Sequence, residues 1–546
     1  MSGGLKKAVN FLKSWDFWGP AVAGLIGGLV FFIFFGETFW PQNIDWILAD
    51  GSDTSQLQLG WEFFRNSAWV WPWGIIKNLN YPAGISVLYT DSLPLLAIFF
   101  KLWRNILPAN FQYIGLWMFI SFILQGVYGF LLMRLIKKDT LLNILGSLFF
   151  IFSPIVWQRI AGHAPLVSHF VVLATLYICL SRKPILRAYH WGFILITALF
   201  THPYLFFMIA PWWLVEQIRL YKLTSKIKWW VSNLIILSLL GALSFIIGMW
   251  TQGEGGAGGF GEFSMNLNSL FNSMGWSKIM PEWPIAQFQF EGFNYLGLGV
   301  LLLGVFSCYF FVFKKRQFFL SVLKRFWPFL LVSVFLTILA LSNKVYFNAH
   351  LIFSYPLPKF IENIFSITRS SGRMFWPVYY LLVFAALFPL CFLKRSVAII
   401  VICLALIFQL ADLSRGLFRQ NLNYTDKVEQ FQSQTSFWRE YISWGYVFSN
   451  YKHVVILPYF NRFDLPISFL VARNSKTLNV GYFVRKQAGT ESFISEQTLK
   501  ICSGNFDKDT AYLFFDNLYK CLPPVETAPN KYTLKKVFNF FVLSPQ

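Results

Sequence analysis

Runs of apolar residues close to the length of a membrane span recur along this chain, and short polar segments separate them. A helix needs about 20 such residues to cross the ~30 Å hydrocarbon core of a bilayer. The pattern therefore predicts an all-α polytopic membrane protein with about 11 transmembrane helices. The predicted spans are 19–36, 111–133, 141–158, 164–181, 189–201, 203–218, 229–250, 294–313, 326–342, 375–393 and 396–413.

Two apolar regions do not fit a simple span. Segment 92–107 carries Lys101 and Arg104, so we expect a helix that lies in the outer membrane interface. Region 189–218 breaks at His202-Pro203, and its first half is only about 20 Å long as a helix. Two short spans and a re-entrant hairpin both remain open for it.

The basic residues set the orientation. The chain has 46 Lys and Arg against 25 Asp and Glu, and only 13% of its residues are charged. Lys and Arg concentrate in the short segments on one side of the predicted spans, which is typical of cytoplasmic loops. The surplus therefore does not indicate nucleic acid. It predicts a cytoplasmic N-terminus, and an odd number of crossings places the C-terminus outside.

The tail after the last predicted span has a different pattern. Domain 1–414 holds the spans, whereas 415–546 has shorter apolar runs and predicts a small extracytoplasmic α/β domain. We expect strands at 454–460, 467–472, 511–515 and 537–543, and helices at 434–449 and 491–501. Cys502 and Cys521 both fall in this exported tail, so we predict a disulfide between them.

The first outer loop, 37–110, is too long for a simple connector and begins with an acidic stretch. Carboxylates such as Asp50 and Asp53 are costly beside a membrane unless they are used or solvated. Asp53 opens the sequence D-T-S-Q, which predicts an N-cap with Gln56 as its capping-box partner. The helix would end near Arg65.

Several motifs together resemble one protein family. The first loop contains SDTSQLQLGWEFFR followed by NYPAGISVLYTDS, and the later motifs are GHAPLVSH (162–169), EGFNYLGLG (291–299) and TRSSGRMFWPVYY (368–380). This ordered set resembles a bacterial branch of the GT-C superfamily of integral membrane glycosyltransferases. The branch commonly has Gly at the position of Ser52 and His at the position of Leu57. The resemblance covers most of residues 18–415 and implies a location in the bacterial cytoplasmic (inner) membrane.

The resemblance implies an inverting transfer from a polyprenyl-phosphate sugar donor to a cell-envelope glycan or lipid acceptor. Such a transfer needs a base for the acceptor hydroxyl and cations for the departing phosphate. We expect Asp53, or alternatively Asp50, to be the base, and Arg369 and Arg373 to bind the donor phosphate. The further substrate-binding candidates are Gln56, Trp61, Arg65, Tyr89, Asp91, His163, His169 and His202.

Each candidate also has an ordinary structural role to offer. Asp53 fits a helix cap, Asp50 a solvated loop, Arg369 and Arg373 anchors to lipid headgroups, and His202 a hydrogen bond at a helix break. The alternative functions are a lipid-linked glycan flippase or transporter, a membrane O-acyltransferase and a non-catalytic assembly factor. No cofactor is required by the sequence, and a divalent metal stays open.

Overall fold

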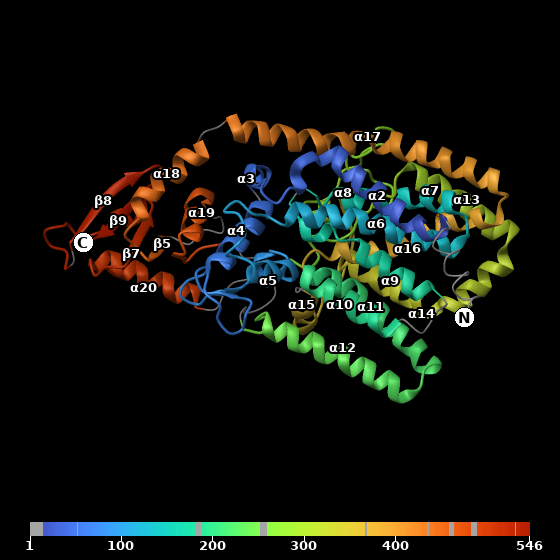
Figure 1. The fold of residues 1–546 in the computed structure, drawn as a ribbon, viewed down its shortest axis with the longest axis horizontal. Helices are drawn as coiled ribbons and strands as arrows, with labels where there is room; N and C mark the ends of the chain where they lie inside the picture. Colours follow the sequence, from blue (N-terminus) through green and yellow to red (C-terminus); the bar gives the residue numbers. More distant parts are fainter. Residues whose placement is uncertain are drawn as a thin grey trace. The chain divides into compact units, whose positions relative to one another are not determined.

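The chain forms two compact units. The computed structural model describes residues 15–51, 53–160, 162–181, 187–251, 259–365, 368–433, 436–457, 464–481, 489–529 and 531–546. One unit, which we call the helical unit, comprises Met1–Pro41, Tyr113–Leu240 and Gly258–Thr425. The other, the mixed unit, comprises Gln42–Gln112, Gly241–Ala257 and Asp426–Gln546. Figure 1 shows the elements of both.

The helical unit is built almost entirely of helices. They are α2 (Trp15–Phe35), η1 (Gly36–Phe39), α6 (Ile114–Ile136), α7 (Thr140–Ile151), α8 (Pro154–Trp157), η3 (Ala164–Val167), α9 (Phe170–Leu180), α10 (Arg187–Thr201), α11 (Pro203–Leu223), η4 (Gln289–Gly292), α13 (Leu298–Tyr309), η5 (Phe310–Lys314), α14 (Arg316–Leu341), α15 (Lys359–Phe365), η7 (Ser371–Phe375), α16 (Trp376–Leu387) and η8 (Phe388–Phe392). Two more helices, α12 (Lys226–Ile246) and α17 (Arg395–Ser433), begin in this unit. Its strands β3 (Lys344–Phe347) and β4 (His350–Ser354) form an antiparallel hairpin.

Every predicted span coincides with a helix, but the predicted number of membrane-crossing helices is wrong. In the described part of the chain, six helices are long and apolar enough to cross a membrane. They are Trp18–Phe39, Ile114–Ile136, Lys226–Ile246, Arg316–Leu341, Ser371–Phe392 and Arg395–Ser433. The chain therefore has the helices of a helical membrane-type protein, with fewer full-length spans than the eleven that its apolar pattern predicts.

The shortfall has a local cause in the predicted span 141–158. Helix α7 ends at Ile151, and α8 starts anew at Pro154 because proline cannot continue a helix with a backbone N–H bond. Twelve residues of α7 reach only about 18 Å. Region 189–218 breaks as predicted, since α10 ends at Thr201 and α11 begins at Pro203.

A glycine contact fixes how α2 and α6 pack. A Cβ added at Gly27 would lie 2.2 Å from the carbonyl oxygen of Phe122, and one at Gly126 would lie 2.2 Å from that of Ala23. The two backbones therefore approach more closely than any side chain allows. Small residues commonly serve this purpose between membrane helices.

The mixed unit combines helices with a sheet. Its elements are α3 (Asp45–Asp50), α4 (Asp53–Asn66), β1 (Ile75–Ile76), β2 (Ile85–Ser86), η2 (Val87–Thr90), α5 (Pro94–Leu102), α18 (Ser436–Phe448), β5 (His453–Leu457), α19 (Leu465–Arg473), β6 (Thr477–Leu478), α20 (Thr490–Ser503), β7 (Thr510–Phe514), α21 (Asp516–Tyr519), β8 (Tyr532–Val537) and β9 (Phe540–Pro545). The described strands of the tail form one sheet in the order β6-β5-β7-β9-β8. Strands β6, β5 and β7 are parallel, and β9 runs antiparallel to β7 and β8.

The tail confirms two predicted helices, as α18 and α20, and two predicted strands, as β5 and β7. The strand predicted at 467–472 is wrong, because this segment is helix α19. Asp464 caps it by accepting a hydrogen bond from the Ile467 N–H at 3.0 Å, and Pro466 occupies its first turn. A short apolar run cannot distinguish a buried strand from a buried helix.

One further strand differs from prediction, and the predicted domain boundary lies within a helix. The strand predicted at 537–543 is the hairpin of β8 and β9, which turns at Phe538 with a positive φ. The boundary expected at 414 falls inside α17, which continues to Ser433. The predicted bond between Cys502 and Cys521 is present in the structure.

The first loop and the tail belong to the same unit, although 313 residues lie between Gln112 and Asp426 along the chain. Leu79 forms a parallel bridge with Leu478 of β6. The Leu478 N–H donates to Asn78 O at 2.8 Å, and the Tyr81 N–H donates to Leu478 O at 3.0 Å. The large first loop is thus folded against the tail domain rather than being a separate extension.

Candidate functional site

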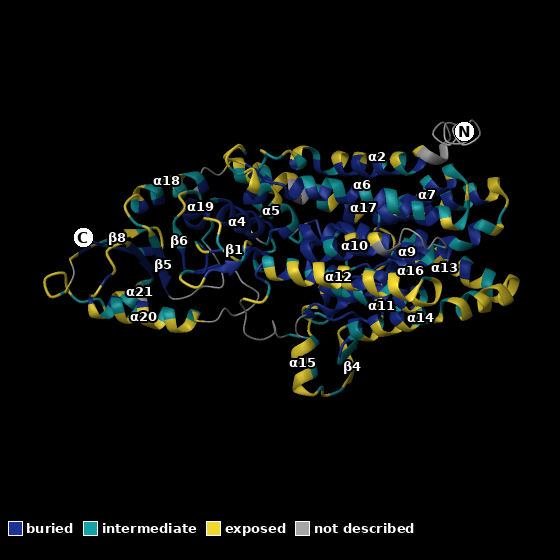
Figure 2. Ribbon diagram, turned by 60° about the horizontal axis from the view of Figure 1, so that its bottom comes forward, coloured by how far each residue is buried: buried dark blue, intermediate teal, exposed yellow. Residues whose placement is uncertain are grey.

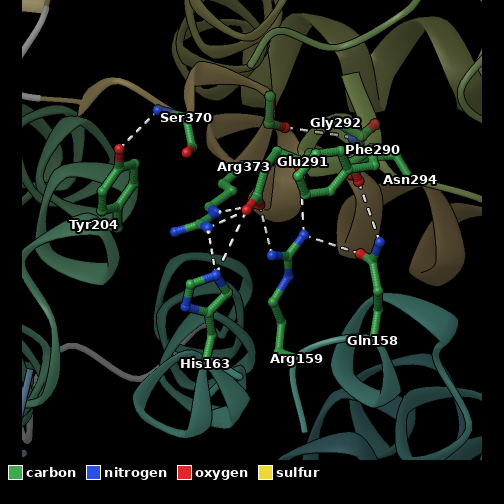
Figure 3. Close-up of polar contacts among 11 residues, drawn as sticks. Gln158, Arg159, His163, Tyr204, Phe290, Glu291, Gly292, Asn294, Ser370 and Arg373 are labelled. Atoms are coloured by element: carbon green, nitrogen blue, oxygen red, sulfur yellow. Dashed lines mark hydrogen bonds and ion pairs between the residues drawn. The ribbon is translucent and has the colours of Figure 1, made fainter. Parts of the chain in front are cut away.

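Four charged or titratable side chains converge in the interior of the helical unit. Glu291 in η4 accepts hydrogen bonds at Oε2 from Arg159 Nη1 at 2.6 Å and from Arg373 Nη2 at 2.8 Å. Arg373 Nε donates to the same oxygen at 3.0 Å. His163 Nε2 lies 3.5 Å from Glu291 Oε1. Figure 3 shows both guanidinium groups pointing at this single carboxylate.

Two glycines bring these residues together. A Cβ at Gly292 would lie 2.3 Å from Ser264 O, and one at Gly372 would lie 2.6 Å from the Cα of Gly292. The backbones of η4 and η7 therefore meet without an intervening side chain, which places Glu291 opposite Arg373. The space that a side chain at Gly372 would take is occupied by the backbone of Gly292, so phosphate oxygens cannot approach there.

The charged groups of this cluster shift one another's pKa. Burial raises the pKa of Glu291, but the positive charges of Arg159 and Arg373 lower it by more. The net effect holds this pKa well below its usual value of 4.5. Burial and the two guanidinium groups hold the pKa of His163 below its ordinary value, against the opposing effect of Glu291. Among the described residues, two guanidinium groups therefore share one ionised carboxylate. Among the described residues Arg159 Nε also finds no acceptor.

A third guanidinium group lies on the same segment as Arg373. Arg369 is partly exposed, and its guanidinium carbon lies 4.6 Å from the centre of the Phe263 ring. Within the described residues Arg369 forms no ion pair. The helix of this segment begins only at Ser371, so Arg369 and Arg373 do not lie on one helical face. The Ser370 N–H between them donates to the Tyr204 hydroxyl at 2.8 Å.

The other two candidate histidines have structural partners. His169 is buried, its Nδ1 lies 2.9 Å from the Tyr380 hydroxyl, and its ring packs 4.1 Å from that of Trp376. His202 Nδ1 accepts a hydrogen bond from the Tyr204 N–H at 3.2 Å and so caps α11. Of the histidines predicted to bind substrate, only His163 lies in the charged cluster.

The acidic candidates lie in the mixed unit. Asp50 Oδ1 forms an ion pair with Lys427 Nζ at 3.0 Å, so this carboxylate has a structural partner. Asp53 is half-buried and is the first residue of α4. The residue that precedes α4, where an N-cap would lie, is therefore residue 52 and not Asp53 as predicted. Residue 52 lies outside the described residues. Gln56 is buried within the same helix.

Three further candidates of the first loop donate hydrogen bonds to backbone carbonyls of the mixed unit, and a fourth ends a helix. The Trp61 indole donates to Phe111 O at 3.2 Å, and the Tyr89 hydroxyl donates to Met249 O at 2.7 Å. Arg65 donates to Leu107 O at 2.8 Å, and Asp91 ends η2 with a positive φ of 55°. These contacts give Trp61, Arg65 and Tyr89 structural roles in this unit.

Sequence reasoning assigned no role to Arg159 or Glu291. Both could have been recognised from the sequence, because a charged residue next to an apolar run is typical of a functional or paired position in a membrane protein. Arg159 follows the apolar SPIVWQ, and Glu291 opens the motif EGFNYLGLG. The described residues contain no group of three His, Cys, Asp or Glu side chains that could hold a metal ion.

Comparisons with known proteins identify a family but no activity. A family model described as a domain of unknown function, DUF6311, matches residues 24–414. A second, described as the DUF6311 C-terminal domain, matches residues 443–545. No curated protein and no solved structure matches the chain.

Proposed function

This chain belongs to the DUF6311 family, whose function is unknown, and from its own residues we propose that it is an inverting membrane glycosyltransferase. It would move a sugar from a polyprenyl-phosphate donor to a glycan or lipid acceptor of the cell envelope, at the outer face of the bacterial cytoplasmic membrane. The supporting resemblance is to the GT-C superfamily.

One observation carries this proposal. In the buried cluster around Glu291, Arg159 and Arg373 direct two guanidinium groups at one carboxylate. Guanidinium groups also bind phosphate with good geometry. Arg369, which forms no ion pair with the described residues, adds a further donor four residues before Arg373. A phosphate carried by a lipid is an anion that a membrane-type protein can meet.

The chemistry assigns separate roles. The acceptor hydroxyl attacks the anomeric carbon of the donor, and the bond from that carbon to the phosphate oxygen breaks with inversion. The bonding electrons leave with the phosphate, whose charge Arg369 and Arg373 would stabilise. The hydroxyl proton passes to a base, for which we propose Asp53 on the strength of the resemblance. Asp50 is the weaker choice because Lys427 already neutralises it.

A transfer assay with purified full-length protein tests the proposal. Synthetic polyprenyl-phosphate sugars are supplied with envelope acceptors, and release of polyprenyl phosphate is measured together with the glycosylated product. Chemical conversion of the donor is expected. If the lipid-linked sugar crosses the membrane unchanged, the protein is a flippase instead. If an acyl group moves, it is an acyltransferase.

Two aspartate variants separate the candidate bases. Asp53→Asn should bind donor but lose roughly 10²-fold or more of its turnover, because the acceptor proton has no base. Asp50→Asn is its matched partner in the same stretch and should lose much less. Near-normal transfer by Asp53→Asn together with an inactive Asp50→Asn would assign the base to Asp50.

A further inference from the structure

The segment between α14 and η7 presents an unusually apolar surface. All residues of β4 are exposed, and so are Phe360 and Ile364 of α15. We call this the apolar hairpin surface, and it consists of Phe347, Leu351, Ile352, Phe353, Phe360 and Ile364, with exposed fractions from 47% to 67%. Figure 2 shows β4 and α15 in the yellow of exposed residues.

Polar contacts at its turn and along β3, rather than apolar packing, hold this hairpin in place. Asn348 has a positive φ of 52°, which suits a two-residue hairpin turn. Asn266 Nδ2 donates to Asn348 O at 2.7 Å, and Asn268 Nδ2 donates to Asn348 Oδ1. The Leu267 N–H donates to Tyr346 O at 3.0 Å. The chain therefore fixes the hairpin while leaving its apolar side chains uncovered.

The hairpin continues the apolar surface of a candidate membrane span. Strand β3 begins at Lys344, three residues after α14 ends at Leu341. One side of α14 exposes Leu331, Val334, Phe335 and Ile338, as a helix facing lipid does. Lys344 and Lys359 lie at the two ends of the apolar stretch, where phosphate headgroups would attract them.

Both faces of the hairpin are apolar, and this favours lipid over a protein partner. Successive side chains of a strand point to opposite faces, so Leu351 and Phe353 lie on one face and Ile352 on the other. All three are at least 50% exposed. A protein partner would cover one face of a two-stranded ribbon, whereas acyl chains surround both.

We propose that the apolar hairpin surface inserts into the interfacial region of the membrane leaflet next to the Leu341 end of α14. The backbone polar groups at the hairpin edges need partners, so the hairpin lies at the headgroup boundary and not in the hydrocarbon core. This inference is independent of the proposed transferase activity.

Lipid quenching of a fluorescent label tests it in the full chain. Cys179, Cys308, Cys391 and Cys403 are first changed to alanine, and the Cys502–Cys521 bond is kept. Ile352→Cys and Leu351→Cys then carry nitrobenzoxadiazole in vesicles of phosphatidylcholine and phosphatidylglycerol. Leu331→Cys on α14 is the control for lipid contact, and Lys531→Cys in the tail is the control outside the candidate spans.

The proposal requires spin-labelled lipids to quench both hairpin labels about as strongly as the label at Leu331, and much more than the label at Lys531. Quenching by aqueous iodide instead would show that the hairpin lies in water and would overturn the proposal. A label reached by neither quencher, or lipid quenching on only one face, would show that a protein or a second copy covers the surface. Using both faces guards against one label perturbing the turn.

Discussion

Replacing Glu291 with glutamine tests whether one carboxylate holds the buried cluster together. Its Oε2 accepts three bonds of 2.6 to 3.0 Å from two arginines, and the side chains of Arg159, Glu291 and Arg373 are at most 8% exposed. Solvent screening therefore reduces these interactions little. Removing one partner of a buried ion pair costs about 3–5 kcal/mol, because the remaining charge loses its compensation. Glutamine keeps one acceptor oxygen, so we expect about 3 kcal/mol.

Thermal unfolding of the detergent-purified protein measures this loss. Tryptophan emission is a suitable signal, since the chain has 23 tryptophans and the Arg159 guanidinium carbon lies 5.6 Å from the centre of the Trp376 ring. The melting temperature of Glu291→Gln should fall by several degrees relative to wild type.

Glu282→Gln is the matched control. Glu282 is an exposed glutamate of the same loop and forms no ion pair among the described residues, so its loss should change stability by no more than about 0.5 kcal/mol. Equal melting temperatures for the two glutamine variants would refute the assigned role of Glu291 in holding the two arginines.

Two other predictions concern the mixed unit. Burial and, to a smaller extent, Arg104 lower the pKa of Lys101 from 10.5 to about 7, so between these values the unfolded chain binds a proton that the folded chain does not. The stability of the folded chain should therefore rise with pH from about 7 to 10.5. In melting curves Lys101→Met should flatten this rise. The control Lys77→Met changes an exposed lysine and should keep the rise. Removing the Cys502–Cys521 bond by a double alanine substitution should cost about 3 kcal/mol, because a loop of this size loses its constraint on the unfolded chain. An unchanged denaturation midpoint would contradict that estimate, and mass spectrometry of unreduced wild type should find neither thiol free.

The sequence predicts the positions of the helices well because apolar runs and proline breaks act locally. The break at His202-Pro203 and the tail helices α18 and α20 are examples. Span length was harder to predict, since η3 and Pro154 shorten helices inside runs that remain apolar throughout. Periodicity also could not identify α19 as a helix, because nearly all of its side chains are buried.

Long-range contacts were beyond a reading of local pattern. The bridge from Leu79 to Leu478 joins the first loop to the tail sheet, and no motif in either segment predicts it. The candidate site shows the same limit. Arg373 and His163 were identified from family motifs, but the carboxylate that unites them depends on Gly292 and Gly372 meeting.

The two predicted phosphate ligands differ in what they already bind, so they should not behave alike. Arg373 donates twice to Glu291 and stacks 5.1 Å from the Tyr204 ring, which makes it part of the buried framework. Arg369 lies against the Phe263 ring, is partly exposed and forms no ion pair within the described part of the chain. Its donors are therefore the ones that a phosphate can take without breaking such a pair. Arg369→Lys would then weaken donor binding and leave the melting temperature unchanged, since lysine keeps the charge but loses the planar fork. Arg373→Lys would lower the melting temperature as well, because Glu291 loses its paired donors. Equal behaviour of the two variants in both measurements would mean that Arg369 serves only as a headgroup anchor or that Arg373 is less tightly held than its bonds imply.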